Sequence, residues 1–547
     1  MNFLFLTLIL VLCVFPKAII CRTNMFSVGV TNAAIAVGAA AALSSIPQSL
    51  SEKTSWKPVR VKVPKALRSV FVNKQHKLSK ITTSSTKLSD TSNKISQTTV
   101  IPSKRSSVNS IKDMTRNIKN RIDNTASALV SRTNILRKNK DKSISKPGNT
   151  PVIAAGGKDK KKLLILMSDT GGGHRASAQA IDQALKEQFP GKIDVDIMDI
   201  WTEHAKYPFN NFVPAYRYLA KHPLLWRGFY LYGNFPPTKL FTETWSKKWC
   251  YKSFRNAIKS SNPDMVVSVH PLCQLMPISI VKEMNKNRDE SKPKIPFITV
   301  VTDLGGAHST WFDKRADMCF VPSDAVEDIA LKNGISRDKI TQRGLPIRPK
   351  FWKRKSSNAK YSFRKGLGLS KKDRTVLLMG GGDGVGGLEK IATEVANRLG
   401  QSSKSSQVVV ICGNNQKIQN YLNAKVWPKN VKMHIKGFCN NIDEYMAASD
   451  CLVTKAGPGT IAEAMTNGLP MILSSFLPGQ EAGNVPYVVD GGFGKYTGNK
   501  PKLIGDEVYK LFKNERQLDE MSKRAKSLAR PDATVTIAKD IGTRLLQ

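Results

Sequence analysis

Acidic residues are scarce at the front of this chain. The first 150 of its 547 residues hold about 25 Lys and Arg but only five acids, Glu52, Asp90, Asp113, Asp123 and Asp141. About half of the net charge of +43 therefore lies in about a quarter of the chain. Such an excess favours binding to polyanions, either nucleic acid or anionic lipid surfaces.

Two common signatures are missing as well. The cysteines form no C-x-x-C pair, and their spacings fit neither a zinc site nor a disulfide framework. We therefore expect reduced, mostly buried thiols and a reducing compartment for the folded part. The glycine-rich stretch GGGDGVGG (380–387) lacks the Lys-Ser/Thr ending of a P-loop, which argues against ATP hydrolysis through a Walker site.

The N-terminal part of the chain has the composition of a targeting sequence. Residues 2–21 are an apolar run with no charge before Lys17, long enough for a signal-peptide core and short for a spanning helix. We predict a signal peptide over 1–21, with a membrane anchor as the alternative. Residues 22–150 are rich in Ser, Thr, Lys and Arg, so we predict a largely disordered transit peptide. A nucleic-acid-binding arm is the other alternative, but it lacks interleaved aromatic residues.

Apolar runs that alternate with helical patterns predict an α/β fold with two doubly wound parallel sheets. The first set of strands is expected at 163–169, 195–200, 264–269 and 297–302. After a basic linker with a short helix (353–374), a second set is expected at 376–379, 408–412, 432–436, 451–454 and 470–474. We predict domains over 161–350 and 370–530, a C-terminal helix over 531–547, and a ligand cleft lined by the strand ends of both sheets.

Four motifs carry the chemistry. SDTGGGHRASA (168–178) places His174 at a helix entrance after a glycine turn, where it could act as a base, or merely face solvent. GGGDGVGG, which contains Gly381, suits a turn near a diphosphate. In KAGPGTIAEA (455–464), Thr460 could cap a helix whose amides would hold a diphosphate, and Glu463 could reach ribose hydroxyls.

The fourth motif, LPGQEAGNVPYV (477–488), offers Gln480, Glu481 and Asn484 as hydrogen-bonding partners for a sugar. Arg348, in GLPIRP between the halves, could counter a leaving diphosphate or be an ion-pair partner. Residues 201–237 mix aromatic and basic side chains, which suits a membrane interface. There we expect prolines and glycines to interrupt helical periodicity.

Together SDTGGGHRASA, YPFN, TDLGGAHSTWF, GLPIRP, LLMGGGDG, KAGPGTIAEA and GQEAGNVPYVV resemble the monogalactosyldiacylglycerol synthase family over residues 162–530. The resemblance implies a GT-B glycosyltransferase that moves galactose from UDP-galactose to the sn-3 hydroxyl of 1,2-diacylglycerol with inversion. It also implies peripheral association with a plastid envelope membrane, a response to anionic lipids such as phosphatidylglycerol, and no cofactor, metal or nucleic acid. The two-part address resembles that of algae whose plastids lie inside extra membranes.

The resemblance also implies site residues. His174, helped by Asp303, would remove the proton of the acceptor, and His204, Pro208 and Phe209 would meet the acceptor or lipid. The implied donor site comprises Arg348, Gly381, Gly437, Phe438, Lys455, Gly457, Pro458, Gly459, Thr460, Ile461, Ala462, Glu463, Gln480, Glu481, Ala482, Gly483, Asn484 and Val485.

Three other functions remain open at this point. A related transferase could use UDP-glucose or another lipid acceptor, since the fold signals would be the same. A basic nucleic-acid-binding protein would show salt-sensitive retention of DNA or RNA. A membrane-binding module without activity is the third.

Overall fold

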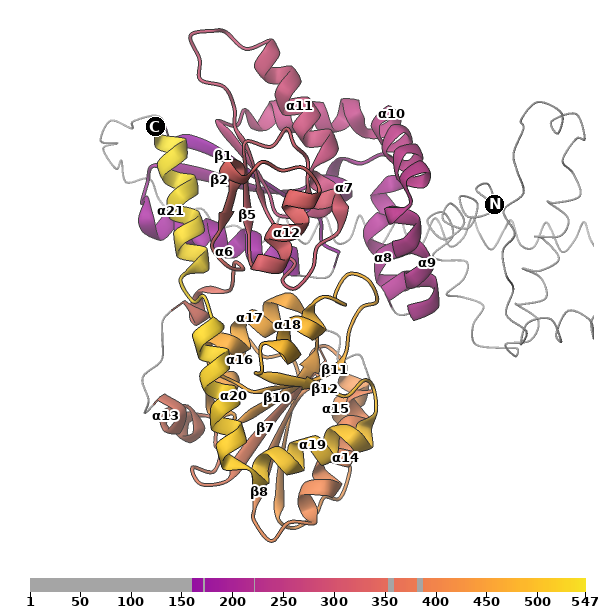
Figure 1. Cartoon of the computed structure of the whole chain (residues 1–547), viewed down its shortest axis with the longest axis vertical. Helices are drawn as coiled ribbons and strands as arrows, with labels where there is room; N and C mark the ends of the chain where they lie inside the picture. The colour runs from indigo at the N-terminus through magenta and orange to yellow at the C-terminus, as the bar shows by residue number, and fades with distance from the viewer. Residues whose placement is uncertain (1–159, 171–172, 221, 353–358, 381–386) are drawn as a thin grey trace, which may run out of the picture. The chain divides into compact units, whose positions relative to one another are not determined.

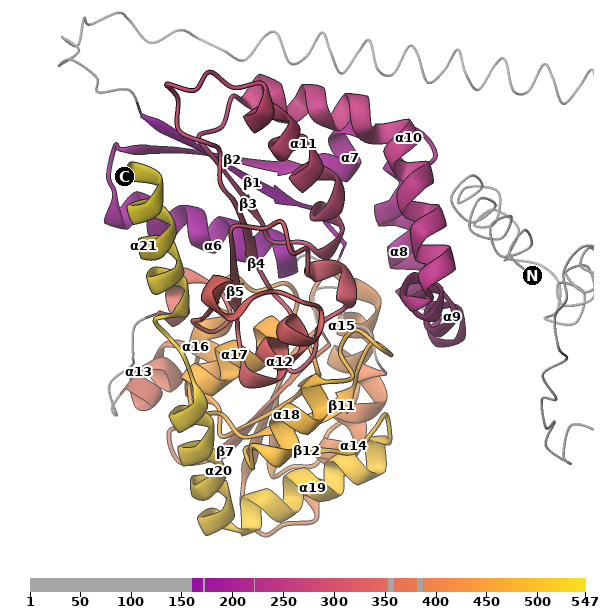
Figure 2. The ribbon, with the colours of Figure 1, turned by 45° about the horizontal axis from the view of Figure 1, so that its top comes forward.

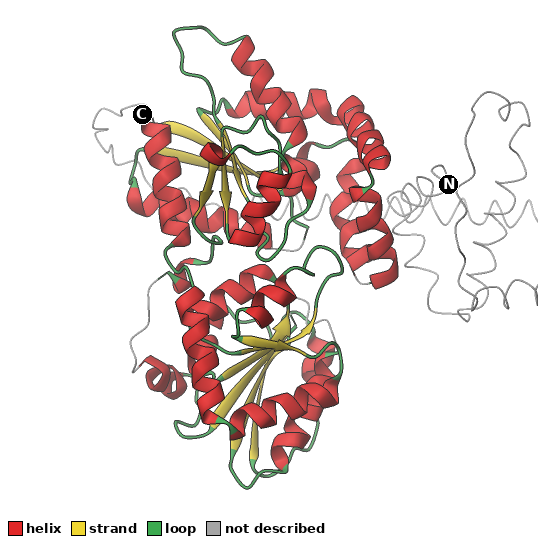
Figure 3. Ribbon diagram, viewed as in Figure 1, coloured by secondary structure: helices red, strands yellow, loops and turns green. Residues whose placement is uncertain are grey.

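A computed structural model describes residues 160–170, 173–220, 222–352, 359–380 and 387–547. The predicted signal and transit segments and Gly381 lie outside these residues. Within them the chain forms two six-stranded sheets, and every strand pair is parallel (Figure 3). Helices flank both sheets in the doubly wound manner predicted from the sequence.

The first sheet has the strand order β2-β1-β3-β4-β5-β6. Its strands are β1 (Lys161–Met167), β2 (Ile193–Asp199), β3 (Met265–Ser268), β4 (Phe297–Val300), β5 (Met318–Val321) and β6 (Ile340–Gln342). The four predicted strands are confirmed. β1, β3 and β4 are almost entirely buried, as their apolar runs indicate, whereas β2 alternates with exposed Asp194 and Asp196. β5 and β6 were not predicted; β6 is only three residues long, and none of its residues is fully buried.

Helices cover both faces of this sheet. One face packs on α6 (Gly173–Gln188) and α21 (Ala533–Leu546), so the last helix of the chain completes the core of the first half (Figure 1). The other face packs on α7 (Ile200–His204), α10 (Pro236–Ser261) and α11 (Leu275–Lys286). A smaller core lies beside α12 (Asp324–Lys332). The described part of this half also contains the short 3-10 helices η2 (Phe209–Asn211), η3 (Pro271–Cys273), η4 (Ser309–Trp311), η5 (Arg337–Lys339) and η6 (Pro349–Phe351).

The second sheet has the order β12-β11-β10-β7-β8-β9. Its strands are β7 (Arg374–Met379), β8 (Ser406–Ile411), β9 (Val431–Lys436), β10 (Cys451–Lys455), β11 (Met471–Ser475) and β12 (Gly494–Tyr496). The five predicted strands are confirmed, and β12 is an unpredicted edge strand. Helices cover both of its faces (Figure 2): α16 (Ile442–Ala448), α17 (Pro458–Thr466) and α18 (Asn484–Asp490) on one, and α14 (Leu388–Gly400), α15 (Gln416–Asn423) and α19 (Pro501–Lys513) on the other. The helix α20 (Glu515–Leu528) contributes residues to the cores on both faces.

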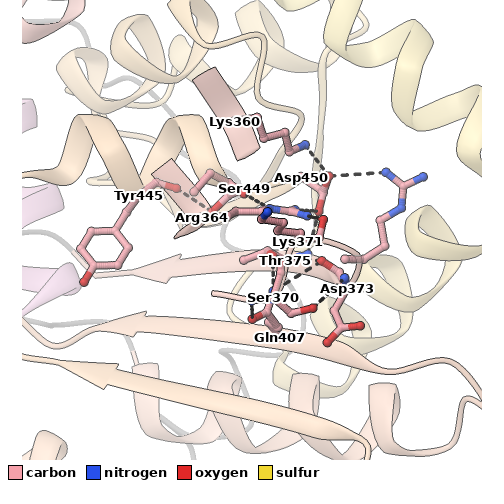
Figure 4. A network of polar contacts seen from close by, with 12 residues as sticks. Lys360, Arg364, Ser370, Lys371, Asp373, Thr375, Gln407, Tyr445, Ser449 and Asp450 are labelled. Carbon is pink, nitrogen blue, oxygen red and sulfur yellow. Dashed lines mark hydrogen bonds and ion pairs between the residues drawn. The ribbon is translucent and has the colours of Figure 1, made fainter. Parts of the chain in front are cut away.

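The short helix predicted in the linker is α13 (Ala359–Gly366). A buried carboxylate holds it against the second sheet: Asp450 pairs with Arg364 at 2.7 Å and also with Lys360 (Figure 4). Burial raises the pKa of Asp450, but the charges of Lys360 and Arg364 lower it by more, so the carboxyl stays ionised at neutral pH. Figure 4 shows that this network joins α13 to the strands of the second sheet.

The aromatic segment after β2 is helical, and the expected interruptions by prolines fall at the junctions between its helices. It forms α7, α8 (Phe212–Ala220) and α9 (Pro223–Asn234), and continues into α10. Pro223 and Pro236 each occupy a helix start, where a missing N–H costs nothing. The prolines therefore begin these helices instead of breaking them. The expectation of buried thiols is confirmed for five of the six cysteines in the described residues.

Candidate active site

Three loops at the ends of neighbouring strands gather the polar side chains of the first half. They follow β1, β3 and β4, which lie side by side in the sheet. His174 stands on the first turn of α6, His270 follows β3 and Asp303 follows β4. All three side chains are buried, with exposed fractions of 8%, 2% and 5%. Ligands of parallel sheets bind at this edge, so these loops form the candidate acceptor site.

The protonation of His174 is set by its surroundings. Its Nδ1 lies 2.9 Å from the Val269 carbonyl oxygen and 2.9 Å from Thr302 Oγ1. Because a carbonyl only accepts, Nδ1 carries the proton and the lone pair is on Nε2. Burial lowers the pKa of His174 to about 4, against the opposing effects of the Val269 hydrogen bond and the charge of Asp169. At neutral pH the ring is therefore uncharged and Nε2 can accept a proton.

A second buried histidine, not identified from the sequence, packs edge-on against His174 with ring centroids 4.3 Å apart. Nδ1 of His270 accepts the Leu272 amide at 3.1 Å, so its Nε2 donates to Thr170 Oγ1 at 2.8 Å. Burial, and then the neighbouring His174, lower the pKa of His270 well below its ordinary value. Its position directly after a buried strand was the signal that sequence analysis could have used.

Asp303 is a buried carboxyl whose pKa suits acid–base chemistry. Its Oδ2 accepts a hydrogen bond from Trp311 Nε1 at 2.7 Å. Burial raises the pKa of Asp303 to about 7, the Trp311 bond opposes this, and the charge of Glu481 adds to it. The ring of Trp311 also lies 6.1 Å from that of His174, centroid to centroid. The two predicted catalytic residues therefore lie beside one fully buried tryptophan.

The start of α17 forms the candidate donor site in the second half. Its N-cap is Gly457, which makes no side-chain cap, so the first amides of the helix have no side-chain partner there. The prediction that Thr460 caps this helix is wrong, because Thr460 is the third residue of the helix. Lys455 and Glu481 form an ion pair. The pair lies beside this helix start, because a Cβ built on Gly457 would be 3.2 Å from Lys455 Nζ and 3.8 Å from Glu481 Oε1.

The loop after β11 contacts the first half of the chain. Asn484 accepts the Gly305 amide at 2.7 Å and donates to the Ala456 carbonyl at 2.8 Å. Its carboxamide, which we predicted as a sugar contact, is thus engaged at both ends within the protein. Gly305 and Gly483 allow the close approach, because a Cβ on either would lie within 2.4 Å of the other's carbonyl oxygen. Gln480 differs, as its Oε1 accepts from Tyr216 at 2.9 Å and its side chain is partly exposed.

Arg348 is an ion-pair partner in this structure. Its Nε and Nη2 each lie 2.6 Å from an oxygen of Glu463, a bidentate geometry. Burial lowers the pKa of Arg348, but the hydrogen bonds and charge of Glu463 raise it by more. Glu463 is 5% exposed, while the Arg348 side chain is 42% exposed. The pair joins GLPIRP to α17 and leaves the Arg348 side chain partly exposed.

The other implied donor residues fall into three places. Ile461 is fully buried in a hydrophobic core, so its side chain packs inside the protein. Phe438 is 63% exposed just after β9, beside Gly437. The remaining residues lie on α17, in the loop before α18 or on α18 itself: Pro458, Gly459, Ala462, Ala482 and Val485.

The implied acceptor residues lie around α7. His204 ends α7 and is 35% exposed, and Pro208 precedes η2. Phe209 packs against Trp201 with ring centroids 6.4 Å apart. Within the described part of the chain, none of these three residues makes a hydrogen bond or ring contact with His174. Within the same part, no group of His, Cys, Asp or Glu is arranged to hold a metal ion.

The outward face of α10 is aromatic and basic. Trp245 and Trp249 are 45% and 44% exposed, and their rings stack with centroids 6.4 Å apart. At helical spacing the exposed Lys248 and Lys252 share this face, opposite Cys250 and Phe254 in the core. Leu231 and Phe235, at the junction with α9, are 60% and 55% exposed. No described helix is both long and apolar enough to span a bilayer.

Comparison with known proteins gives consistent matches to both halves. Residues 174–347 match the family model described as monogalactosyldiacylglycerol (MGDG) synthase, and residues 375–537 match the glycosyltransferase family 28 C-terminal domain. The chloroplastic MGDG synthase of Spinacia oleracea is 41% identical over 389 residues, which cover 68% of this chain and 70% of that protein. MGDG synthase 1 of Arabidopsis thaliana is 40% identical over 387 residues, covering 68% and 69%.

Among solved structures, MurG of Acinetobacter baumannii is similar over 70% of this chain and 99% of that one, with 15% identity and a TM-score of 0.46.

Proposed function

The chain belongs to the monogalactosyldiacylglycerol synthase family, and from that premise we propose how it transfers galactose from UDP-galactose to the sn-3 hydroxyl of 1,2-diacylglycerol. The observation that carries the mechanism is the state of His174: buried and neutral, with its lone pair on Nε2. A neutral imidazole at the end of a sheet is equipped to take the proton of an alcohol.

The reaction is then a single displacement. His174 Nε2 removes the hydroxyl proton, the freed oxygen bonds to the anomeric carbon, and the bond from that carbon to UDP breaks with inversion. The resulting imidazolium lies in a buried site where positive charge is costly. A carboxylate at Asp303, which lies beside the same Trp311 as His174 without bonding to the imidazole, offsets part of that charge through space.

On the donor side, UDP binds at the start of α17. The amides after Gly457 suit a diphosphate, and Lys455 and the exposed part of Arg348 supply positive charge as UDP departs. Phe438 is exposed at the end of β9, where its ring can stack on the uracil. These groups stabilise the leaving group without a metal ion or other cofactor.

The acceptor reaches the enzyme from a membrane. We infer that the outward face of α10 docks on an anionic bilayer of the plastid envelope, which contains lipids such as phosphatidylglycerol. Paired tryptophans with lysines between them suit the interface between head groups and acyl chains. The 26-residue α10 contains one acidic residue, Glu243, so its charge complements an anionic surface.

The test is a transfer assay on liposomes. The full chain is incubated with labelled UDP-galactose and diacylglycerol in phosphatidylglycerol-containing vesicles, and the lipid product is analysed for a β-linkage. Parallel reactions receive labelled UDP-glucose. We expect galactolipid to dominate. Faster transfer from UDP-glucose would support the related transferase instead, and no lipid product from either sugar would contradict both.

A further inference from the structure

The helical hairpin formed by α8 and α9 holds the loop after β11. Tyr216 Oη donates to Gln480 Oε1 at 2.9 Å, and Trp226 Nε1 donates to the Pro478 carbonyl at 2.7 Å. At Gly479 a Cβ would lie 2.5 Å from the ring of Tyr230. Three successive residues of the loop are therefore contacted by aromatic side chains of the first half.

The contact with Gln480 also fixes which way its amide faces. Burial raises the pKa of Tyr216, and the charges of Glu481 and Asp303 raise it further, so the phenol keeps its proton at neutral pH. Its single O–H is directed to Oε1, since only the oxygen of the carboxamide accepts. The Nε2 group, which carries two N–H donors, is then turned away from Tyr216.

We propose that Tyr216 is a positioning residue for the donor sugar: by holding Gln480 Oε1, it presents the Nε2 donors of Gln480 to a hydroxyl of the galactose. This rests on the proposed function, in which the loop at 477–485 contacts the sugar. A fixed donor binds a hydroxyl better than one that must first be oriented, because the ordering entropy is already spent. Tyr216 itself touches Gln480 and not the substrate.

The experiment separates sugar binding from nucleotide binding. Tyr216→Phe removes only the phenolic hydroxyl, so we expect the KM for UDP-galactose to rise about 3- to 10-fold. The inhibition constant of UDP, which has no sugar, should stay within about twofold. Tyr218→Phe is the matched control: it removes the same group from the same helix, where the ring packs against His222. It should leave both constants unchanged.

A double-mutant cycle tests whether the effect passes through Gln480. Gln480→Ala should raise the KM by itself, and adding Tyr216→Phe should then change nothing further. Independent effects of the two substitutions, or a parallel rise in the UDP constant, would overturn the proposal by showing that Tyr216 only braces the loop.

The wild-type reaction distinguishes the remaining outcomes. An active wild type with an unchanged KM in Tyr216→Phe would overturn this inference alone. A wild type without any galactosyl transfer would overturn the proposed function, and this inference with it.

Discussion

At the residue scale, the acceptor site depends on which ring nitrogen of His174 carries the proton. The Val269 carbonyl holds the proton on Nδ1, so Nε2 is the only basic atom of the ring. His270 packs against the same ring and is itself held by Leu272 and Thr170. The local contacts thus fix both the orientation and the tautomer of the base before any substrate binds.

Replacing His174 with Ala tests the base directly. We expect turnover to fall by about 10² to 10⁴-fold, the usual contribution of a general base. UDP affinity, measured by calorimetry, should persist because His174 is not among the proposed contacts to UDP. His434→Ala, on edge strand β9, controls for the loss of a histidine as such. Near-normal turnover in His174→Ala would refute the role.

Asp303 predicts a pH dependence with a definite sign. Its pKa is about 7 and that of His174 is about 4. Between pH 6 and 8, His174 stays neutral while Asp303 loses its proton, so transfer should rise with pH through about 7. In Asp303→Asn the rate should be lower, and this rise should disappear from the kcat profile. A rise of unchanged midpoint in the variant would assign the titration to another group.

Residue identities were predictable from the sequence only where they belong to a continuous motif. His174 and Glu481 lie in such motifs, but His270 and Tyr216 owe their places to packing between distant segments. Asn484 shows the converse, because its motif indicated a sugar contact while the fold uses its carboxamide to join Gly305 to Ala456. Sequence patterns do not reveal which polar groups the protein itself will satisfy.

At the element scale, the strands with clear apolar runs were predictable, whereas β5, β6, β12 and the helical insert were not. Runs such as 163–167 are buried on both faces of a parallel sheet, which leaves a clear apolar signal. The helices α8 to α10 have mixed faces, because part of their aromatic surface packs inward and part stays exposed. Their periodicity is therefore weak, and prolines that mark helix starts look like helix breakers.

The exposed face of α10 makes a prediction about membrane binding. Trp245→Ala with Trp249→Ala removes two large interfacial side chains, so partitioning onto phosphatidylglycerol vesicles should weaken by about 10-fold or more. Co-sedimentation measures the binding. Tyr421→Ala, which removes an exposed aromatic from α15 in the second half, should leave partitioning unchanged. Equal partitioning of the tryptophan variant and wild type would exclude α10 as the docking surface.

At the scale of the whole molecule, the order of the chain and the order of packing differ. The chain builds the first half, then the second, and its last helix α21 returns to the first. Thr534 Oγ1 accepts the Ile347 amide at 2.8 Å, and Arg343 pairs with Asp540 at 2.9 Å, so α21 also holds the segment between the halves. A helix at 531–547 was predictable, but its packing against the first half was not. Helical periodicity shows that a helix has an apolar face, but it does not show which part of the protein covers that face.

This arrangement predicts that the C-terminal helix α21 stabilises the first half of the structure. Ile541 is fully buried in the core shared by α21, α6 and β1, so Ile541→Ala should lower the free energy of unfolding of the first half by about 2–5 kcal/mol. Thr543→Ala, on the exposed side of α21, should have little effect. In thermal unfolding, UDP should still protect the second half of the Ile541 variant while the first half unfolds at lower temperature. If both substitutions lowered the Tm equally, the core contact of α21 would not be what secures the first half.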